Sequence, residues 1–468
     1  MKVDLSHYTA EHRRELEALF ERDSWQQTVQ SGLVETVREE KADPGSTIDY
    51  IETVVHQLLD INGGRARHLI AEGKREQADL LDELSRWPEE MGGKTPVLSY
   101  IGFNVTAECN FNPKCAYCNQ PKVASLVGSD RWKAVIEEIS ESHPDGTYIY
   151  ITGGEPLCLG EDIWGDDGIV RHAAERGIAV NVNTNASLLT PKVALRLIKA
   201  GLSKLHISLD SADPDTQNYL FGGKRFSSVL EGIYNVQLAR DVTGVSYPVI
   251  HTNCVLTARN LAAFPELFAF ILEKHKQTVD SEDPFYNDLF PHVIPVGGSN
   301  DGLRPAADDF KRFYEIIWPR VTAMWDNYQA DQGVPKGKRG ILFGYFSNPF
   351  LRVQHENGLD AYTMASEKGR YGELALARHC YVAPTQACFT PDGNQYRCGS
   401  HAIRRIHALG NIRERGIFEN IRDGIAGLGR FPNPDDCYGC ALATLYINQS
   451  VESQLLKKIE SWQKGADG

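Results

Sequence analysis

The sequence lacks any long apolar run and any hydrophobic segment at its start. No run approaches the ~20 apolar residues that cross a bilayer. The first residues, Met-Lys-Val-Asp-Leu-Ser-His-Tyr-Thr, contain no secretory signal core. We therefore expect a cytoplasmic protein with no membrane partner. In that compartment disulfides are rare, so the ten cysteines are expected to be metal ligands.

The sequence also lacks an excess of basic residues. It has 49 Lys and Arg against 62 Asp and Glu, which gives a formal net charge of −13. Binding to a phosphate backbone needs a basic surface, so nucleic acid is not expected as a partner. There are no internal repeats and no low-complexity tracts. A length of 468 residues indicates two to four domains.

Residues 1–94 lack a strand pattern and are predicted to be helical throughout. Thr9 is a candidate N-cap for a first helix, and Ser46 or Thr47 for a second. Asn62-Gly63 is predicted to end that second helix. A third helix is expected over residues 65–87. This region does not resemble a strand-containing peptide-recognition module.

From residue 97 onward, apolar segments alternate with helical segments. Strands are predicted at residues 97–105, 147–152, 178–184, 204–209, 248–256 and 290–296, with helices such as 132–140, 192–200 and 228–238 between them. Six such units in order predict a parallel sheet with helices outside it. Sites in such sheets lie at the carboxyl ends of the strands. A bridging helical segment is predicted over residues 301–378, including a helix at 307–328.

Two motifs follow the first two predicted strands. The first is a loop with Cys109, Cys115 and Cys118, and the second is Gly153-Gly154-Glu155-Pro156. Three thiolates can hold three irons of a [4Fe–4S] cluster and leave the fourth iron open to another ligand. The glycine turn offers bare backbone and a carboxylate to a charged amine. The alternatives are a zinc knuckle and a chance clustering of buried thiols, although three Cys without a nearby His make a poor four-ligand site.

Together these motifs resemble those of the radical S-adenosylmethionine (radical SAM) superfamily, in a variant with the spacing Cys-x5-Cys-x2-Cys. The resemblance implies a partial (βα)6 barrel over residues 95–300. It also implies that SAM binds the open iron and is cleaved reductively to a 5′-deoxyadenosyl radical. A reductant such as flavodoxin or ferredoxin would supply the electron. Residue by residue, the implied SAM contacts are Tyr117, Gly153, Gly154, Glu155, Asn185, Ser208, Asp210, Asn253 and Val296.

A second cysteine group lies near the C-terminus. Cys380, Cys398, Cys437 and Cys440 supply four thiolates, and Pro391-Asp392-Gly393 predicts a hairpin turn. The spacing resembles the SPASM/Twitch domains that follow many radical SAM cores, which implies an auxiliary [4Fe–4S] cluster in residues 379–468. A four-thiolate zinc site is the alternative. Cys388 is interpreted as a buried small hydrophobe.

The resemblance implies hydrogen-atom abstraction from a small-molecule or natural-product substrate. A fully ligated auxiliary cluster favours electron transfer and therefore net oxidation, by dehydrogenation or bond formation. One alternative is a redox-neutral epimerase, which needs a hydrogen donor such as Cys158, Cys254 or Cys388. Strand alternation places Cys254 on the face opposite Asn253, outside the barrel. A ribosomal-peptide maturase is a second alternative, and a non-catalytic metal-binding scaffold is a third. The substrate cannot be identified from the sequence.

Overall fold

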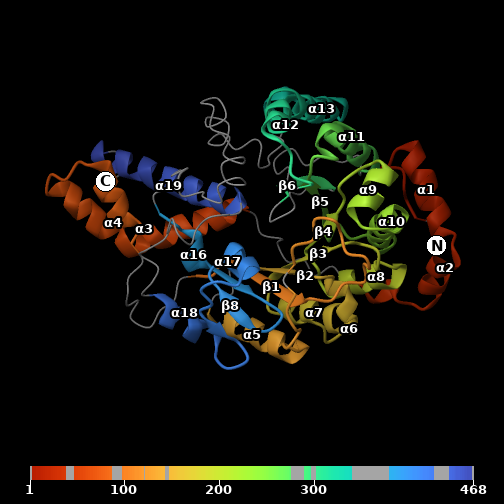
Figure 1. Ribbon diagram of the computed structural model, residues 1–468, viewed down its shortest axis with the longest axis horizontal. Helices are drawn as coiled ribbons and strands as arrows, with labels where there is room; N and C mark the ends of the chain where they lie inside the picture. Colours follow the sequence, from red (N-terminus) through yellow and green to blue (C-terminus); the bar gives the residue numbers. More distant parts are fainter. Residues whose placement is uncertain are drawn as a thin grey trace. The chain divides into compact units, whose positions relative to one another are not determined.

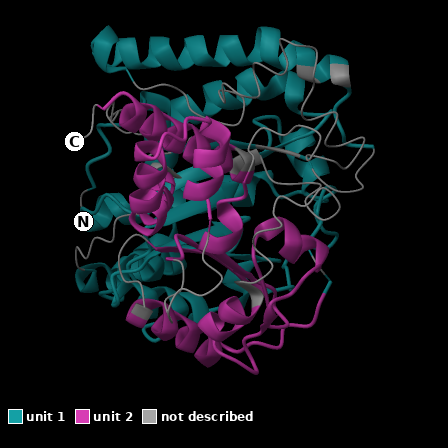
Figure 2. Ribbon diagram, turned by 90° about the vertical axis from the view of Figure 1, so that its left-hand side faces the viewer, with its two compact units in different colours: residues 1–44, 106–122, 151–360 teal, residues 45–105, 123–150, 361–468 magenta. Residues whose placement is uncertain are grey.

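The structure is a computed structural model of the full chain. It describes residues 3–37, 47–86, 97–120, 122–142, 147–275, 289–296, 302–339, 379–425 and 442–465. The chain divides into two compact units (Figure 2). Unit 1 comprises residues 1–44, 106–122 and 151–360, and unit 2 comprises residues 45–105, 123–150 and 361–468. The division into four consecutive domains stays a prediction.

The described elements form an α/β fold with a largely parallel sheet, which confirms the predicted fold class (Figure 1). Hydrogen bonds join the strands in the order β6-β5-β4-β3-β2-β1-β7-β8-β9. The first six strands are β1 (Tyr100–Thr106), β2 (Tyr148–Gly153), β3 (Ala179–Thr184), β4 (Lys204–Ser208), β5 (Val249–Leu256) and β6 (Phe290–Pro295). Each lies within two or three residues of its predicted bounds.

In unit 1 the two faces of the sheet differ in character. Strands β3 to β6 are parallel, with Asn183 opposite His206 and His206 opposite His251. One face is apolar and fully buried, with Val182, Ile207 and Ile250 all 0% exposed. Because strand side chains alternate, the intervening residues share the other face, and they are mainly Asn and His. The sheet therefore presents a polar inner surface.

Helices complete unit 1. They are α1 (Ala10–Phe20), α2 (Asp23–Gln30), α6 (Glu161–Trp164), α7 (Ile169–Ala174), α8 (Pro191–Lys199), α9 (Pro214–Leu220), α10 (Phe226–Thr243), α11 (Phe264–Lys274), α12 (Ala307–Arg312) and α13 (Trp318–Asp331). Thr9 caps α1 by accepting a hydrogen bond from His12 N, as predicted. The buried Trp25 of α2 donates to Asn235 of α10 at 2.8 Å. A π-helical turn, η5 (Phe313–Ile317), links α12 and α13.

In unit 2, strand β1 pairs in parallel with β7 (Gln386–Phe389), which forms a hairpin with β8 (Asn394–Tyr396). The predicted turn at Pro391-Asp392-Gly393 is therefore confirmed. Strand β9 (Gly410–Asn411) follows β8. The helices are α3 (Thr47–Ala71), α4 (Gln77–Leu84), α5 (Ser129–Ser142), α16 (Val382–Thr385), α17 (Gly399–Arg404), α18 (Ile417–Ile425) and α19 (Leu442–Gln463).

The predicted helix end at Asn62-Gly63 is wrong, because α3 continues through both residues to Ala71. The Asn62 amide donates to the carbonyls of Leu84 and Arg86 at 2.9 and 2.7 Å instead of stopping its own helix. Gly63 faces α19, where a Cβ would make an ordinary van der Waals contact with the Trp462 ring at 3.5 Å. The third helix is accordingly α4, which begins at Gln77 and not at residue 65. Within residues 3–37 and 47–86 no strand occurs, as expected.

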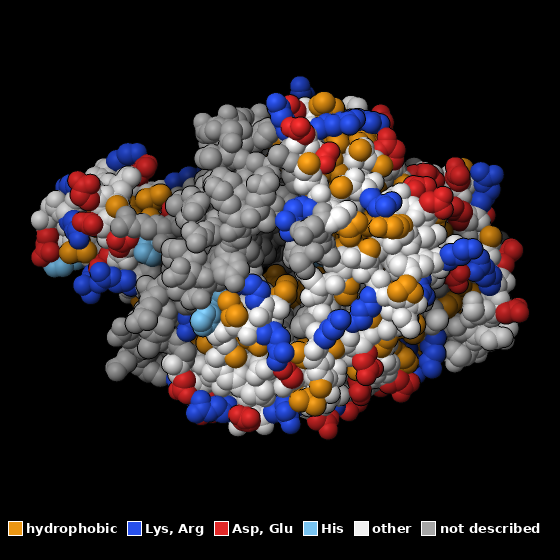
Figure 3. Space-filling model, viewed as in Figure 1, with side chains coloured by type: hydrophobic (Ala, Val, Ile, Leu, Met, Phe, Trp, Pro, Cys, Tyr) orange, Lys and Arg blue, Asp and Glu red, His pale blue; other side chains and the backbone are white. Residues whose placement is uncertain are grey.

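Acidic and basic side chains are interspersed over the described part of the face in Figure 3. None of the described helices has the length and apolar character that a membrane-spanning segment requires.

Candidate functional site

The loop with the three cysteines begins just after β1 and is anchored inside unit 1. The ring of Phe111 is 2% exposed and packs against Phe221, with 5.4 Å between ring centroids. The Arg225 guanidinium lies 4.5 Å from the centre of the Phe111 ring. Further along the loop, Ala116 N donates to Leu220 O at 2.8 Å. The five-residue gap between Cys109 and Cys115 is therefore held by specific contacts.

The Gly-Gly-Glu-Pro turn lies directly against the start of this loop. Gly154 N donates to Thr106 O, and Glu155 N donates to Glu108 O, both at 2.7 Å. A Cβ on Gly154 would lie 1.9 Å from Glu108 O, so no other residue fits there without moving the backbone. The two motifs form one structural unit at the strand ends, as their positions in the sequence predict.

The carboxylate of Glu155 is 1% exposed and accepts three hydrogen bonds from the protein. Its Oε1 accepts from Leu157 N and Thr184 Oγ1 at 3.1 and 2.7 Å, and its Oε2 accepts from Asn185 N at 2.7 Å. A carboxylate offers about four acceptor positions, so one remains for an external donor. Burial raises the pKa of Glu155 to about 7, although the three donors act to lower it.

A network of amides and hydroxyls joins the cysteine loop to the end of β3. Asn185 Nδ2 donates to Asn110 Oδ1 at 2.9 Å, and Asn110 Nδ2 donates to Ser187 Oγ at 2.8 Å. Ser187 in turn donates to Asn185 Oδ1 through its hydroxyl, at 2.6 Å. Asn185 is a predicted site residue, whereas Asn110 is not, because nothing local in the sequence indicates a partner 75 positions away.

The end of β4 contributes Asp210, which is 1% exposed. Tyr117 Oη donates to Asp210 Oδ2 at 2.6 Å, and Val255 N donates to Asp210 Oδ1 at 2.7 Å. Burial raises the pKa of Asp210 to about 7. The structure thus brings together two predicted site residues, Tyr117 and Asp210, from the loop and from β4.

Three further predicted site residues lie on or after neighbouring strands. Ser208 lies opposite Asn253 in the β4–β5 register, and Asn253 Nδ2 donates to Asn183 Oδ1 at 2.9 Å. Val296 is buried just after β6 and donates its N–H to Leu256 O at 3.0 Å. All the predicted SAM contacts therefore lie within the residues of unit 1.

The spacing of the three loop thiols bears on what they could hold. In the described part of the chain they do not form a group whose ligand atoms all lie within 4.8 Å of one another. One zinc ion with bonds of about 2.3 Å would need its sulfurs within roughly 4 Å. As placed, the three thiols are therefore farther apart than the sulfur ligands of one zinc ion. Burial raises the pKa of Cys109, and that of Cys115 to about 12, so metal binding must displace protons.

Comparisons with known proteins agree with this geometry. Residues 103–256 match the sequence model of the radical SAM superfamily. The mycofactocin maturase MftC of Mycobacterium tuberculosis is 23% identical over 338 residues, which cover 71% of each chain. The AdoMet-dependent heme synthase of Methanosarcina barkeri is 27% identical over 333 residues, which cover 68% of this chain and 82% of the synthase. Residues 103–256 are therefore a radical SAM domain.

A solved structure shows a similar fold. Streptococcus suis SuiB bound to its precursor peptide SuiA has a TM-score of 0.50 at 15% identity, over 74% of this chain and 70% of SuiB. A [4Fe–4S] cluster and SAM are the cofactors of the family that this domain matches. Which residues bind them stays a prediction.

In unit 2 the structure describes two of the four predicted auxiliary ligands, Cys380 and Cys398. Both pack against the same apolar core, which includes Tyr381. Cys437 and Cys440 lie outside the described residues. The Cys380 thiol accepts a hydrogen bond from Asn448 Nδ2 at 3.9 Å. Burial nevertheless raises the pKa of Cys380 to about 11.

The remaining cysteines differ in exposure. Cys388 is 4% exposed, pairs with Tyr396 across the hairpin, and lies 3.3 Å from where a Cβ on Gly102 would be. This environment is that of a buried small hydrophobe, as interpreted from the sequence. Cys254 is 1% exposed, with its Sγ 3.7 Å from Asp210 O, whereas Cys158 is exposed.

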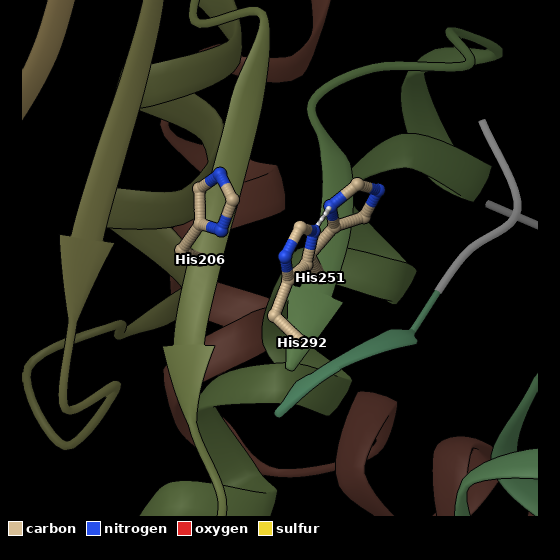
Figure 4. Close-up of side chains that lie close together, drawn as sticks. All are labelled: His206, His251 and His292. Atoms are coloured by element: carbon tan, nitrogen blue, oxygen red, sulfur yellow. Dashed lines mark hydrogen bonds between the residues drawn. The ribbon is translucent and has the colours of Figure 1, made fainter. Parts of the chain in front are cut away.

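Three histidines on the polar inner face of unit 1 are not among the predicted site residues. His206 on β4, His251 on β5 and His292 on β6 converge on one another in Figure 4. Their closest ring nitrogens, His251 Nδ1 and His292 Nε2, are 2.9 Å apart. The available signal is strand alternation: His206 is two residues before Ser208, and His251 is two residues before Asn253, so each pair shares one face.

Proposed function

We propose that this protein cleaves SAM reductively and oxidises a small-molecule or natural-product substrate by hydrogen-atom abstraction. When bound, the cluster and SAM supply a 5′-deoxyadenosyl radical at the strand ends, after an external reductant has donated one electron. The observation that carries the proposal is the joining of the cysteine loop to the Gly-Gly-Glu-Pro turn. Their backbones meet through two hydrogen bonds of 2.7 Å, and Gly154 leaves no room for a side chain.

We assign each proposed site residue a role. Cys109, Cys115 and Cys118 would hold the cluster. The fourth acceptor position of Glu155 would receive the methionine ammonium of SAM, beside the backbone of Gly153 and Gly154. Asn185, Ser208, Asp210, Asn253 and Val296 would line the remainder of the SAM site, with Tyr117 held in place by Asp210.

We propose a net oxidation because the C-terminal cysteines would hold a cluster that can accept an electron. Loss of a hydrogen atom leaves a carbon radical, which must lose one electron and one proton to give a closed-shell oxidised product. Cys380, Cys398, Cys437 and Cys440 would hold an auxiliary cluster that supplies the electron acceptor. The Asn448 amide, which donates to Cys380 Sγ at 3.9 Å, is a donor of the kind that adjusts the potential of such a group.

A small substrate is favoured because the described N-terminal residues, 3–37 and 47–86, form helices and no strand-containing recognition module. Maturation of a ribosomal peptide is the second candidate, and its support is the likeness to a mycofactocin maturase over 71% of the chain. An epimerase would need an accessible hydrogen donor. Of the three thiols considered, Cys158 is exposed, whereas Cys254 and Cys388 are buried.

The test begins with anaerobic reconstitution of the full chain with iron and sulfide. Addition of SAM and dithionite should then yield 5′-deoxyadenosine. Replacement of Cys109, Cys115 and Cys118 by Ala should abolish that product. Replacement of the exposed Cys158 by Ala is the matched control and should leave SAM cleavage intact. SAM cleavage that survives loss of the three loop thiols would overturn the proposal.

Solvent deuterium separates the oxidative reaction from the epimerase. An oxidation leaves no solvent hydrogen at the reacting carbon, whereas an epimerase returns one. Deuterium at a single inverted carbon, lost in the Cys158→Ala variant, would replace oxidation by epimerisation. A peptide that alone supports turnover would favour the maturase.

A further inference from the structure

We propose that His206, His251 and His292 form a binding site for one divalent transition-metal ion of the zinc class. The site is separate from both cysteine groups and lies on the polar inner face of unit 1. It does not depend on the proposed function, because its ligands and its test involve no SAM chemistry.

The strand register places the three histidine side chains on one face of the sheet. His206 and His251 are paired residues of β4 and β5, and His292 is paired with Asn253 on the next strand. Inward orientation follows from the bond between Asn253 and Asn183, which joins β5 to β3 across the face of β4. Since Asn183 and His206 are register partners, His206 occupies that same face. Figure 4 shows the rings arriving from three separate strands.

The distances suit a shared ligand. One ring nitrogen of each histidine lies within 4.8 Å of the others. Among groups of three His, Cys, Asp or Glu side chains in the described part of the chain, this one has its ligand atoms that close together. Nitrogens bound to one tetrahedral ion at about 2.0–2.1 Å lie roughly 3.4 Å apart. On metal binding, the ring nitrogens of His251 and His292, now 2.9 Å apart, would move slightly apart, and the His206 ring would move slightly closer to them.

The protonation states also suit a metal. In the bond between His251 Nδ1 and His292 Nε2, one ring donates and the other accepts, so one lone pair is masked by a proton. Transfer of that proton to the other nitrogen of the donor ring exposes both lone pairs. The ring stays neutral, so a metal can bind without net proton release from this pair. Imidazole is a preferred ligand of Zn²⁺ and related ions.

The surroundings provide room for more than the three rings. Asn181 precedes Asn183 by two residues on β3, so the two share the inner face. Asn181 is 4% exposed, and its Oδ1 has no hydrogen-bond partner among the described residues. A buried acceptor of this kind normally has a partner. A metal-bound water or a ligand donor would provide it.

Lys204 lies opposite Asn181 in the register and is 7% exposed. Its positive charge acts against a bare cation beside His206 and His292. An anionic oxygen in the fourth coordination position would offset that charge, and three His ligands leave such a position open. The fourth position is therefore available to water or to an anionic oxygen ligand.

The alternative is a structural cluster of buried histidines that binds no metal. The distinguishing experiment uses the full chain with its iron–sulfur clusters reconstituted, because free thiols would otherwise bind zinc. Addition of one equivalent of Zn²⁺, followed by gel filtration with a weak chelator, should leave about one zinc per chain. X-ray absorption at the zinc edge should show nitrogen and oxygen ligands at about 2.0–2.1 Å and no sulfur at about 2.3 Å.

Two variants complete the test. His251→Gln and His292→Gln should each lower the retained zinc at least tenfold with iron content unchanged. The control variant His172→Gln changes a half-buried histidine of helix α7 and should retain the zinc. Sulfur ligation, no retained zinc in the unaltered chain, or equal zinc in all variants would each overturn the proposal. The ligation of the unaltered chain decides the question even if a variant fails to fold. Absence of zinc binding would not affect 5′-deoxyadenosine formation, so the metal-site proposal and the proposed function can be refuted independently.

Discussion

At the scale of single residues, Glu155 combines a structural task with a proposed binding task. Its carboxylate holds the ends of β2 and β3 together through Leu157, Thr184 and Asn185. A conservative change therefore has two separable effects, one on folding and one on SAM.

We expect Glu155→Gln to weaken SAM binding by about tenfold or more, since a charge-assisted hydrogen bond is worth ~1.5–3 kcal/mol. The new amide must also face the Asn185 N–H group or turn away from Leu157 and Thr184, which should lower the unfolding free energy by ~1–3 kcal/mol. Calorimetric titration of SAM and thermal unfolding measure the two effects. Glu161→Gln, exposed on the same segment, is the control. Unaltered SAM affinity with intact cluster absorbance would remove Glu155 from the site.

Asp210 predicts a pH dependence of stability. Burial raises its pKa from 3.8 to about 7, so between these values the folded state binds more protons than the unfolded state. Stability is therefore greatest below the unfolded pKa and falls as pH rises through the folded one. Between about pH 6 and about pH 7.5 this loss amounts to about 1 kcal/mol. Asp210→Asn should remove it, as measured by urea unfolding of the reconstituted protein at both pH values. An equal pH slope in both proteins would contradict the assigned protonation state.

At the scale of elements, α3 shows where local signals mislead. Asn62-Gly63 has the composition of a helix end, yet α3 passes through it because both residues serve contacts with other helices. By contrast, the sequence predicts the strands to within two or three residues. Their signal is apolar alternation, which is local and is reinforced by the neighbouring strands.

The two adjacent glycines of α3 should respond differently to substitution. A Cβ on the exposed Gly64 meets nothing within 4 Å, so Gly64→Ala should raise the unfolding free energy by about 1 kcal/mol through helix propensity. Gly63→Phe should lower it, because the ring would displace Trp462 of α19. Thermal unfolding monitored by circular dichroism compares them. If both changes stabilise the protein equally, the α3–α19 contact does not limit residue 63.

At the scale of the whole molecule, the amount of iron tests the two cysteine groups together. Seven thiolates in two groups should hold about eight iron and eight sulfide ions per chain. Cys398→Ala should lose about half of this iron, whereas Cys388→Ala should keep all of it, because Cys388 is buried against Gly102 and Tyr396. Anaerobic iron, sulfide and zinc analysis provides the measurement. About four iron with one zinc would overturn the auxiliary cluster and leave the SAM site standing.

The division of the chain into two units does not follow from the order of its elements. Residues 1–94 look uniformly helical, yet residues 1–44 belong to unit 1 and residues 45–94 to unit 2. Trp25 contacts Asn235, whereas Tyr50 bonds to Thr385 at 2.8 Å. The same limit applies to the site. Motifs such as Gly153-Gly154-Glu155 are short and visible in the sequence, whereas the histidine group requires the register of three strands that are about 40 residues apart.

The anchored gap between Cys109 and Cys115 has a consequence for protein engineering. A chimera with the loop shortened to Cys-x3-Cys-x2-Cys by removal of Asn110 and Phe111 would lose the side chains that contact Ser187, Asn185 and Arg225. Those three residues would lose their hydrogen-bond and cation–π partners, and the shortened loop would no longer be held against them. A successful exchange would have to replace the loop together with the segments after β3 and α9 that contact it. The cysteine spacing therefore cannot be changed alone, because the loop and the segments that contact it depend on one another.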